Sequence, residues 1–452
     1  MASAYLSKTA AGAGNNTTGT LSLWFKRSGE GGATQRLYQH TTDSDHFMEV
    51  GINGSDRIFM YSYDNPTNVL YLLTNARVKD YGAWYHLVCA FDSTQGTNTN
   101  RAKMYVNGNQ ITDFNTSTYP SQNADLFFNK SGQTQYVASN YQSGYRWDGL
   151  IAHLHWADGQ QYAASNFGEF DSNGVWTPKT SPTLSYGTNG HFLKFDNSAN
   201  MGLDSSGQTN NFTTSGSVVQ TKDTPSFNQT TFNSIDNRFD DTTLTNCSLT
   251  MSGGRISTGF DMIRATFGAD SGKWYYEMKA ADLAEIDQVG IGIQNGVSMQ
   301  NEGASGFNGN VQGYGVQMSN GYKVGVGQSG AAYMGAFSAG DICMVAVDLD
   351  NDKITFGRNG QWANGSGAAD QTYANSTAAF TGLSDVRGYV PMFANRNSGN
   401  NNTGVMHFNF GNGQFGTSNV ASAGSNGNGF VFEYDVPTGF YAWNTKNLKD
   451  QS

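Results

Sequence analysis

Glu169 and Asp171 are the two carboxylates whose spacing comes closest to acid–base chemistry. Acids at alternate positions of a strand project from one face, and retaining hydrolysis of a glycosidic bond uses two carboxyl groups about 5–5.5 Å apart. Catalytic strands of this kind carry a third acid, in the pattern Glu-x-Asp-x-x-Glu, and that acid is missing here. Asp171-Ser-Asn-Gly is also typical of a turn. We therefore expect a loop at this point and predict that the protein is not an enzyme.

His153 and His155 would project two imidazoles from one face of a strand, a spacing that can bind a metal ion. Asp158 follows nearby, but Ile151 shares the face and no other histidine clusters with the pair. We interpret the two histidines as structural and predict no metal site.

Asp348, Asp350 and Asp352 resemble a calcium loop in spacing, yet the glycine and distal glutamate of an EF-hand are absent. A turn between two strands explains them better. The glycines at 325, 327 and 330 imitate a dinucleotide fingerprint, but no helical pattern follows them. We expect no cofactor.

Aromatic residues in polar loops are the remaining candidates for ligand contacts. Tyr141 and Tyr145 lie in a Gly/Ser/Asn loop, and Phe307-Asn308 lies in the Gly/Asn stretch 303–313. A flat ring beside an amide or carboxylate suits a sugar, so we predict these four as binding residues. Trp147, beside the run 150–156, is predicted to be a core residue.

The elements that position these residues are predicted to be strands. The chain has 452 residues, with 56 glycines, 13% aromatic residues and only 14% charged residues, against about 25% in typical domains. Glycine and asparagine supply turn conformations, and aromatic residues suit pleated, half-buried surfaces. Helical periodicity is almost absent, so we predict an all-β, antiparallel fold.

Net charge and cysteine usage exclude several classes of function. The formal net charge is −10, which disfavours binding to nucleic acid. Cys89 and Cys343 alternate with apolar residues and are expected to be buried, and no Cys-x-x-Cys motif is present. No run is long and apolar enough for a membrane span, and the first residues show no secretory signal, so we expect synthesis in the cytoplasm without membrane insertion.

Strand alternation is clearest in the first part of the chain. Apolar residues alternate in 21–25, 84–92 and 102–106, and the last run ends in Asn107-Gly108, a strong signal for a type I′ turn. Shorter runs at 125–128, 134–138 and 149–156 are predicted to complete the antiparallel set.

Composition then divides the chain. Residues 196–250 are rich in Asn, Ser and Thr and are interpreted as a junction, 251–411 are again dense in strands, and 412–452 hold a Gly/Asn-rich linker and a closing segment. The first and second strand-rich regions share no alignable repeat, which predicts two different sandwiches.

Residues 1–195 resemble the laminin-G/concanavalin A-like jelly roll. The resemblance lies in Trp84-Tyr-His-Leu-Val, followed by a polar loop and Lys103-Met-Tyr-Val-Asn-Gly. It implies two face-to-face antiparallel sheets with loops at the rim available for ligand.

Residues 251–411 are similar to the SPRY domain. The similarity lies in Lys273-Trp-Tyr-Tyr-Glu, the run from Asp341 to Gly360, Tyr389-Val-Pro-Met-Phe and Phe408-Asn-Phe-Gly. It implies a β-sandwich that binds partners through loops and has no catalytic activity. Trp362 and Arg396 lie where SPRY loops often contact partners, and they join the predicted binding residues.

The order of these regions, with Asp204-Ser-Ser-Gly-Gln between them and Pro437-Thr-Gly-Phe-Tyr at the end, resembles virion structural proteins of aquatic bacteriophages. That resemblance implies a tail-fibre or capsid-surface appendage located in the virion. It would bind a host-surface glycan or receptor, or neighbouring virion proteins.

Homo-oligomers are expected for such a role, and a trimer would fit a fibre although no heptads are present. The alternatives are a cellular carbohydrate-binding or adhesion protein, which would need a secretory route, and a polysaccharide-degrading enzyme.

Overall fold

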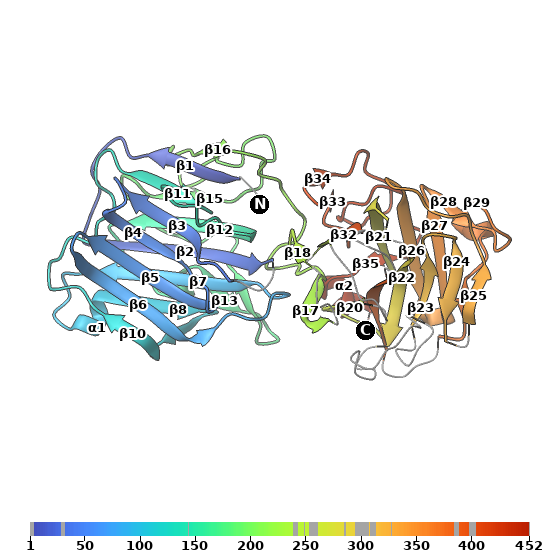
Figure 1. The fold of residues 1–452 in the computed structure, drawn as a ribbon. Helices are drawn as coiled ribbons and strands as arrows, with labels where there is room; N and C mark the ends of the chain where they lie inside the picture. The colour runs from blue at the N-terminus through green and yellow to red at the C-terminus, as the bar shows by residue number, and fades with distance from the viewer. Residues whose placement is uncertain are drawn as a thin grey trace. The chain divides into compact units, whose positions relative to one another are not determined.

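The computed structural model describes residues 4–28, 32–142, 144–237, 243–247, 249–252, 261–283, 286–293, 307, 313–326, 328–383, 388–396 and 404–451. The regular elements among these residues are almost all strands (Figure 1), which confirms the predicted all-β class. The chain divides into two compact units, residues 1–220 (unit 1) and 221–452 (unit 2). The helices in the described residues are short: α1 (Asn98–Arg101), α2 (Thr445–Gln451) and the 3₁₀ turns Ala164–Asn166, Leu349–Asn351 and Tyr373–Asn375.

Unit 1 is a sandwich of two antiparallel sheets with a small hairpin beside it. Its eight-stranded sheet, in spatial order, contains β10 (Phe114–Thr118), β6 (Thr67–Arg77), β5 (Arg57–Asp64), β4 (His46–Ile52), β3 (Gln35–Thr41), β11 (Thr134–Val137), β1 (Tyr5–Thr9) and β16 (Thr213–Ser215). Its six-stranded sheet contains β15 (His191–Leu193), β12 (Gly149–Asp158), β2 (Thr18–Arg27), β7 (Tyr85–Asp92), β8 (Ala102–Val106) and β9 (Asn109–Ile111). The hairpin pairs β13 (Gly168–Phe170) with β14 (Trp176–Pro178).

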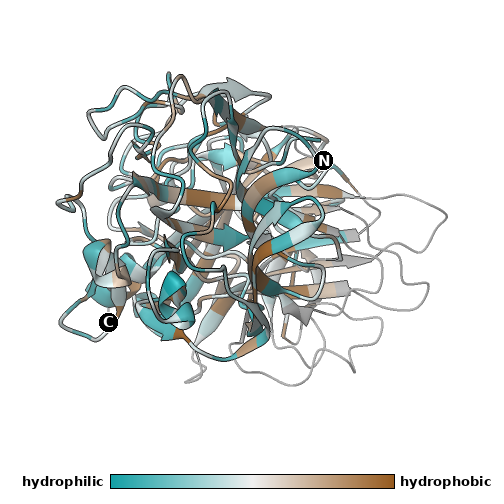
Figure 2. Cartoon of the chain, turned by 90° about the vertical axis from the view of Figure 1, so that its left-hand side faces the viewer, coloured by the Kyte–Doolittle hydropathy of each residue, from teal (hydrophilic) through white to brown (hydrophobic). Residues whose placement is uncertain are grey.

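The core of unit 1 lies between its two sheets. Inward residues of β4 and β5, such as Met48 and Met60, share one cluster with Leu23 and Phe91 from the other sheet. Because side chains alternate along a strand, one face of each strand is apolar and buried. In Figure 2 the brown, hydrophobic segments accordingly lie within strands, whereas many loops are teal.

Unit 2 is a second sandwich. Its seven-stranded sheet contains β17 (Phe232–Asn237), β20 (Asp261–Ala265), β31 (Tyr389–Arg396), β22 (Ile286–Ile293), β23 (Tyr314–Gln317), β24 (Tyr322–Gly325) and β25 (Gln328–Ala332). Its ten-stranded sheet contains β18 (Thr243–Thr245), β19 (Thr250–Ser252), β32 (Val405–Asn409), β21 (Lys273–Asp282), β26 (Ile342–Asp348), β27 (Lys353–Arg358), β28 (Gln361–Ala363) and β29 (Ala369–Gln371), with β30 (Phe380–Thr381) and β35 (Tyr441–Ala442) paired to β27 and β21. A hairpin of β33 (Gln414–Phe415) and β34 (Ser418–Asn419) stands apart from both sheets.

The two larger hydrophobic clusters among the described residues of unit 2 lie on the two faces of its ten-stranded sheet. One lies between the sheets and joins residues such as Val289 and Phe393 to Trp274 and Val345. The other is formed where the closing segment, including Phe432 and Phe440, packs on outward residues of β21, β26 and β28 such as Tyr275, Met344 and Trp362.

The units begin and end at positions that differ from the expected boundaries. Residues 196–220 belong to unit 1, because β16 pairs with β1 and Phe212 is buried in its core. Residues 412–452 are packed rather than linker-like, because their aromatic side chains cover a sheet face. The polar composition of both segments conceals these few buried residues.

The predicted strand at 125–128 is wrong. Leu126 and Phe128 are buried, but Phe127 and Asn129 have φ values of 59° and 60°, in the left-handed region. The Asp125 carboxylate accepts the N–H of Phe127 at 2.9 Å, which stabilises a turn instead of a ladder.

Several local predictions are confirmed. Asn107 and Gly108 both have positive φ, as a type I′ turn requires. Asp348 caps the 3₁₀ turn between β26 and β27 by accepting the N–H of Asn351. Trp147 is a core residue, and Cys89 and Cys343 are buried thiols. Within the described residues, no helix is both long and apolar enough to cross a membrane.

Candidate functional site

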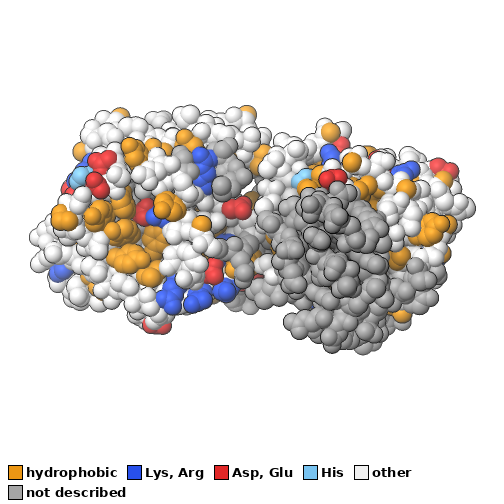
Figure 3. Space-filling view, viewed as in Figure 1, with side chains coloured by type: hydrophobic (Ala, Val, Ile, Leu, Met, Phe, Trp, Pro, Cys, Tyr) orange, Lys and Arg blue, Asp and Glu red, His pale blue; other side chains and the backbone are white. Residues whose placement is uncertain are grey.

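The outer face of the eight-stranded sheet of unit 1 carries a groove of about 330 Å³. We call it the aromatic groove; it is lined by Thr34, Arg36, Glu49, Asn53, Phe59, Tyr61, Asn68 and Tyr71. Figure 3 shows hydrophobic side chains gathered over β4, β5 and β6 on this face, with acidic and basic atoms among them.

Strand alternation places the aromatic residues of the groove. In β5, Ile58 and Met60 point into the core, so Phe59 and Tyr61 point outward. Tyr61 pairs with Glu49 on β4 and with Tyr71 on β6. Residues paired across neighbouring strands lie on the same face, and these three side chains therefore form one row across the sheet.

Glycine at position 51 leaves the space that the Phe59 ring occupies. Gly51 pairs with Phe59, and a Cβ atom there would lie 2.8 Å from Cζ of Phe59 and 2.2 Å from the Gln35 carbonyl oxygen. A side chain at this position would displace the Phe59 ring.

A buried ion pair stands beside the rings. Nε of Arg36 lies 2.7 Å from Oε2 of Glu49, and the Gln39 amide donates to the same carboxylate at 3.0 Å. Burial raises the pKa of Glu49, although Arg36 and Gln39 act in the opposite direction. The Arg36 guanidinium lies 4.9 Å from the centroid of the Phe59 ring, so rings and charges form one packed group.

The aromatic surface continues past the groove towards the start of β4 and the end of β5. The Tyr61 ring lies 5.1 Å from Tyr71 and 5.3 Å from Phe47, and Phe47 lies 5.7 Å from Tyr63, measured between centroids. The Tyr61 hydroxyl donates to the Asn68 side chain at 2.7 Å.

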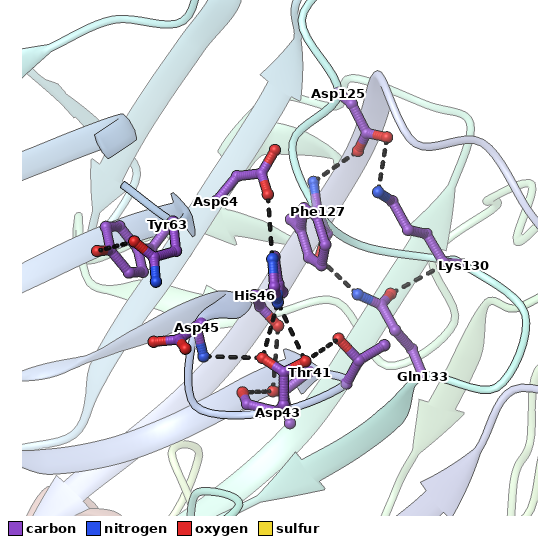
Figure 4. Close-up of polar contacts among 12 residues, drawn as sticks. Thr41, Asp43, Asp45, His46, Tyr63, Asp64, Asp125, Phe127, Lys130 and Gln133 are labelled. Carbon is purple, nitrogen blue, oxygen red and sulfur yellow. Dashed lines mark hydrogen bonds and ion pairs between the residues drawn. The ribbon is translucent and has the colours of Figure 1, made fainter. Parts of the chain in front are cut away.

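A polar cluster lies at the end of this surface (Figure 4), where His46 precedes Phe47 and Asp64 follows Tyr63. Nδ1 of His46 is 2.8 Å from Asp43, its Nε2 is 3.5 Å from Asp64, and its ring stacks on Phe127 with centroids 5.2 Å apart. Both ring nitrogens of His46 therefore have carboxylate partners. Nowhere in the described residues do three or more His, Cys, Asp or Glu side chains gather as a metal site.

Two predicted binding residues lie beside the aromatic groove. Tyr145 is 42% exposed, and its ring centroid lies 4.7 Å from the guanidinium of Arg36, which lines the groove. Tyr141 is 48% exposed, and its backbone N–H donates to the Gln39 side chain at 2.8 Å. The fold thus brings both loop tyrosines to the Arg36–Glu49–Gln39 network.

Phe307 is a core residue, which corrects its prediction as a ligand contact. Its ring is fully buried with Met262, Val324 and Met392. It reaches this position because Gly315 leaves room; a Cβ there would lie 2.2 Å from the Phe307 ring. Asn308 lies outside the described residues.

Trp362 is only 4% exposed and lies at the wall of a second cavity, in unit 2, where its ring contacts that of Tyr373. Arg396 ends β31, where its backbone pairs with Ile286, and its side chain lies outside the described residues. The predicted residues therefore do not form one site.

His155 and Asp171, which were weighed as metal-binding and catalytic candidates, form hydrogen bonds within the protein. Nδ1 of His155 contacts the Tyr186 hydroxyl at 2.8 Å, and a bulge between Ala152 and His155 interrupts the spacing that would align it with His153. Asp171 accepts the N–H groups of Asn173 and Val175, as a turn residue does.

The groove residues themselves are not among the predicted binding residues. Arg57–Asp64 alternates aliphatic Ile58 and Met60 with aromatic Phe59, Tyr61 and Tyr63. Aromatic residues on the face opposite an aliphatic one were the available signal, but a single strand does not show whether that face is open.

Comparisons with solved structures find similarity at low identity. The human HERC1 SPRY domain shares 15% identity with a TM-score of 0.30, covering 39% of this chain and 96% of that one, and another human SPRY domain shares 13% with a TM-score of 0.27, covering 38% and 94%. A heptameric SAP-like pentraxin from Limulus polyphemus shares 13% with a TM-score of 0.26, covering 34% and 69%. Domain 4 of a Geobacillus stearothermophilus extracellular arabinanase, solved with arabinotriose, shares 18% with a TM-score of 0.25, covering 33% and 64%.

A search of curated proteins finds no match. Among protein families, the model of the concanavalin A-like lectin/glucanases superfamily (Laminin_G_3) matches residues 2–164. This range contains β3, β4, β5 and β6. The strands that build the aromatic groove therefore belong to the region that is similar to this superfamily.

Proposed function

We propose that the protein binds carbohydrate in the aromatic groove, without chemical conversion. The observation that carries this proposal is the pair of half-buried rings Tyr61 and Tyr71, in one row with Glu49 of the buried Arg36–Glu49 pair, on the outer face of the sheet.

A sugar ring presents an apolar C–H face and an edge of hydroxyl groups. Flat aromatic rings such as Tyr61 and Tyr71 suit the face. A few fixed polar groups beside them, here Arg36, Glu49 and Asn68, suit the hydroxyl edge, as in most small-molecule sites. The similarity of residues 2–164 to a superfamily of lectins and glucanases supports the same ligand class.

The groove favours binding over hydrolysis because a single carboxylate is found among its described lining residues. Glu49 is the one acid among the described lining residues, whereas a retaining mechanism needs two carboxyl groups about 5–5.5 Å apart. Glu49 is also held by Arg36 and Gln39. We expect no release of reducing sugar from any glycan that binds, and release that Glu169→Gln abolishes would contradict this part of the proposal.

Tyr71→Ala tests the site. A glycan array identifies a ligand for the full chain, and titration calorimetry then compares the variants. We expect the affinity to fall about tenfold or more in Tyr71→Ala, because a ring contact worth about 1–2 kcal/mol is lost.

Phe170→Ala is the matched control, because Phe170 is an exposed ring of unit 1 on β13, outside the groove. Equal losses in both variants, or no glycan bound by the full chain, would refute the proposal.

We propose that this binding serves a bacteriophage virion appendage, a tail fibre or capsid-surface protein that attaches to the host. The resemblance in region order supports the setting, and repeated copies in a homo-oligomer, such as a trimer, would convert weak sites into firm attachment. Mass spectrometry of purified particles should detect the chain, and light scattering should give a defined oligomer. Particles without the chain would overturn the virion role and leave the sugar-binding proposal standing.

A further inference from the structure

A second cavity, of about 610 Å³, lies in unit 2 and is independent of the proposed sugar site. We call it the acidic cleft. Its walls are the turn at Gly360 with the 3₁₀ turn Tyr373–Asn375 on one side, and the closing segment around residues 422–438 on the other.

Aromatic rings form part of the wall. The Trp362 ring contacts Tyr373 edge to face, with centroids 4.9 Å apart. The half-buried Tyr434 ring lies over Gly360, where a Cβ atom would be 3.0 Å from Cδ1 of the tyrosine. Trp362 is buried, so the half-buried rings of Tyr373 and Tyr434 are the ones that present surface to an occupant.

Carboxylates supply the charge of the cleft. Oε2 of Glu433 accepts the N–H of Ala421 at 2.7 Å, and Oδ1 of Asp435 accepts the N–H of Ser425 at 2.6 Å. No lysine or arginine is among the described residues that line the cleft, and no described cation forms an ion pair with either acid.

The local potential is negative. Burial first, and then the charges of Glu433, Glu277 and Asp341, raise the pKa of Tyr434. The bond from the Ser425 N–H lowers the pKa of Asp435, so its carboxylate stays charged near neutral pH. An occupant with positive charge would be stabilised here.

We propose that the acidic cleft binds a basic side chain, arginine or lysine, presented by a partner polypeptide. A cation held between carboxylates and aromatic faces gains charge-assisted hydrogen bonds and cation–π contacts. The volume exceeds one side chain, and the small residues Ser422 and Ala423 lie on one wall, where the partner's main chain would pass.

The test uses the full chain and a capped, fluorescently labelled peptide, Gly-Ser-Arg-Arg-Ser-Gly. The same peptide with citrulline in place of arginine keeps the shape and removes the charge. Fluorescence anisotropy at low salt measures both. We expect the arginine peptide to bind at least about tenfold more tightly, and its affinity to fall as salt is added.

The double variant Glu433→Gln with Asp435→Asn removes both charges and keeps an oxygen for each backbone N–H. Asp370→Asn is the matched control, since Asp370 is an exposed acid of unit 2 outside the cleft. We expect about a tenfold loss of arginine-peptide affinity in the double variant and none in the control.

Three outcomes would overturn the proposal: no binding of the arginine peptide, equal binding of the citrulline peptide, or equal losses in the two variants. Circular dichroism of the double variant confirms that it is folded. Glycan binding by unit 1 is measured separately, so its failure does not bear on the cleft.

Discussion

The Arg36 guanidinium lies over two aromatic rings, Phe59 and Tyr145, and its Nε contacts the Glu49 carboxylate. A planar cation suits this position because it stacks and hydrogen-bonds at once, which lysine cannot do. The pair is rigid before any ligand arrives, so less conformational entropy is lost on binding. Specificity for a sugar would then depend on fixed polar groups.

Glu277 in unit 2 is a buried carboxylate that holds the fold together, whereas Glu49 lines the proposed ligand groove. It accepts the backbone N–H groups of Glu433 and Tyr434 and the Tyr275 hydroxyl, so it ties the closing segment to β21. Burial nevertheless raises its pKa from 4.5 to about 7.

The folded state therefore holds the Glu277 proton more tightly than the unfolded chain does. This contribution to stability is complete below pH 4.5 and is lost as pH rises to about 7, with a size of about 3 kcal/mol. Glu277→Gln should remove that slope from the free energy of unfolding of unit 2, measured with urea between pH 4 and 8. Identical slopes in the variant and the parent chain would contradict it.

At the scale of elements, register builds the aromatic groove. Glu49, Tyr61 and Tyr71 come from three strands and share one row only in the observed pairing. A slip of β5 by one residue against its neighbours would turn Tyr61 towards the core and break the row. The bulge in β5–β6 between Arg57 and Phe59 adjusts the register beside the groove.

Gly51→Ala tests this packing. The new methyl group would meet Phe59 and the Gln35 carbonyl, so we expect a loss of about 1–3 kcal/mol and weaker glycan binding. Differential scanning calorimetry and glycan titration measure the two effects. Gly96→Ala is the control, because nothing lies within 4 Å of that Cβ; equal melting temperatures for both variants would refute the argument.

At the scale of the whole molecule, the boundaries of the units follow buried contacts rather than composition. Residues 196–220 look like linker, yet Phe212 is 5% exposed and its ring lies 4.7 Å from His191. β16 completes the edge of the eight-stranded sheet.

A fragment of residues 1–220 should therefore melt cooperatively, and one of residues 1–195 should be less stable by at least about 3 kcal/mol, the usual cost of losing a buried phenylalanine. Thermal and urea unfolding compare the two. Phe212→Ala in the full chain isolates the side chain. Equal stability of the fragments would place the boundary at 195 after all.

Several features follow from local pattern alone. Alternation in 84–92 and 102–106 predicts β7 and β8, and Asn107-Gly108 predicts the turn that follows β8. The position of Trp147 beside a strand predicts a core residue. These succeed because side-chain period and backbone preference are properties of neighbouring residues.

Other features depend on distant partners. The polar loop predicts Tyr141 and Tyr145 as binding residues, but only the fold sets them beside Arg36 and Gln39. Phe307 lies in an equally polar stretch and is buried, because Gly313 and Gly315 leave space for its ring. A loop's composition does not show where its aromatic side chain goes.

By itself, then, the amino-acid sequence determined the β class, the two sandwiches and many individual turns, since period-two hydrophobicity acts over a few residues. The tertiary structure alone decided which outward faces stay open, which strands align their rings, and which polar segments complete a core. Those outcomes rest on pairing between residues far apart in the chain, and alternation identifies the two faces of a strand without telling which one is covered.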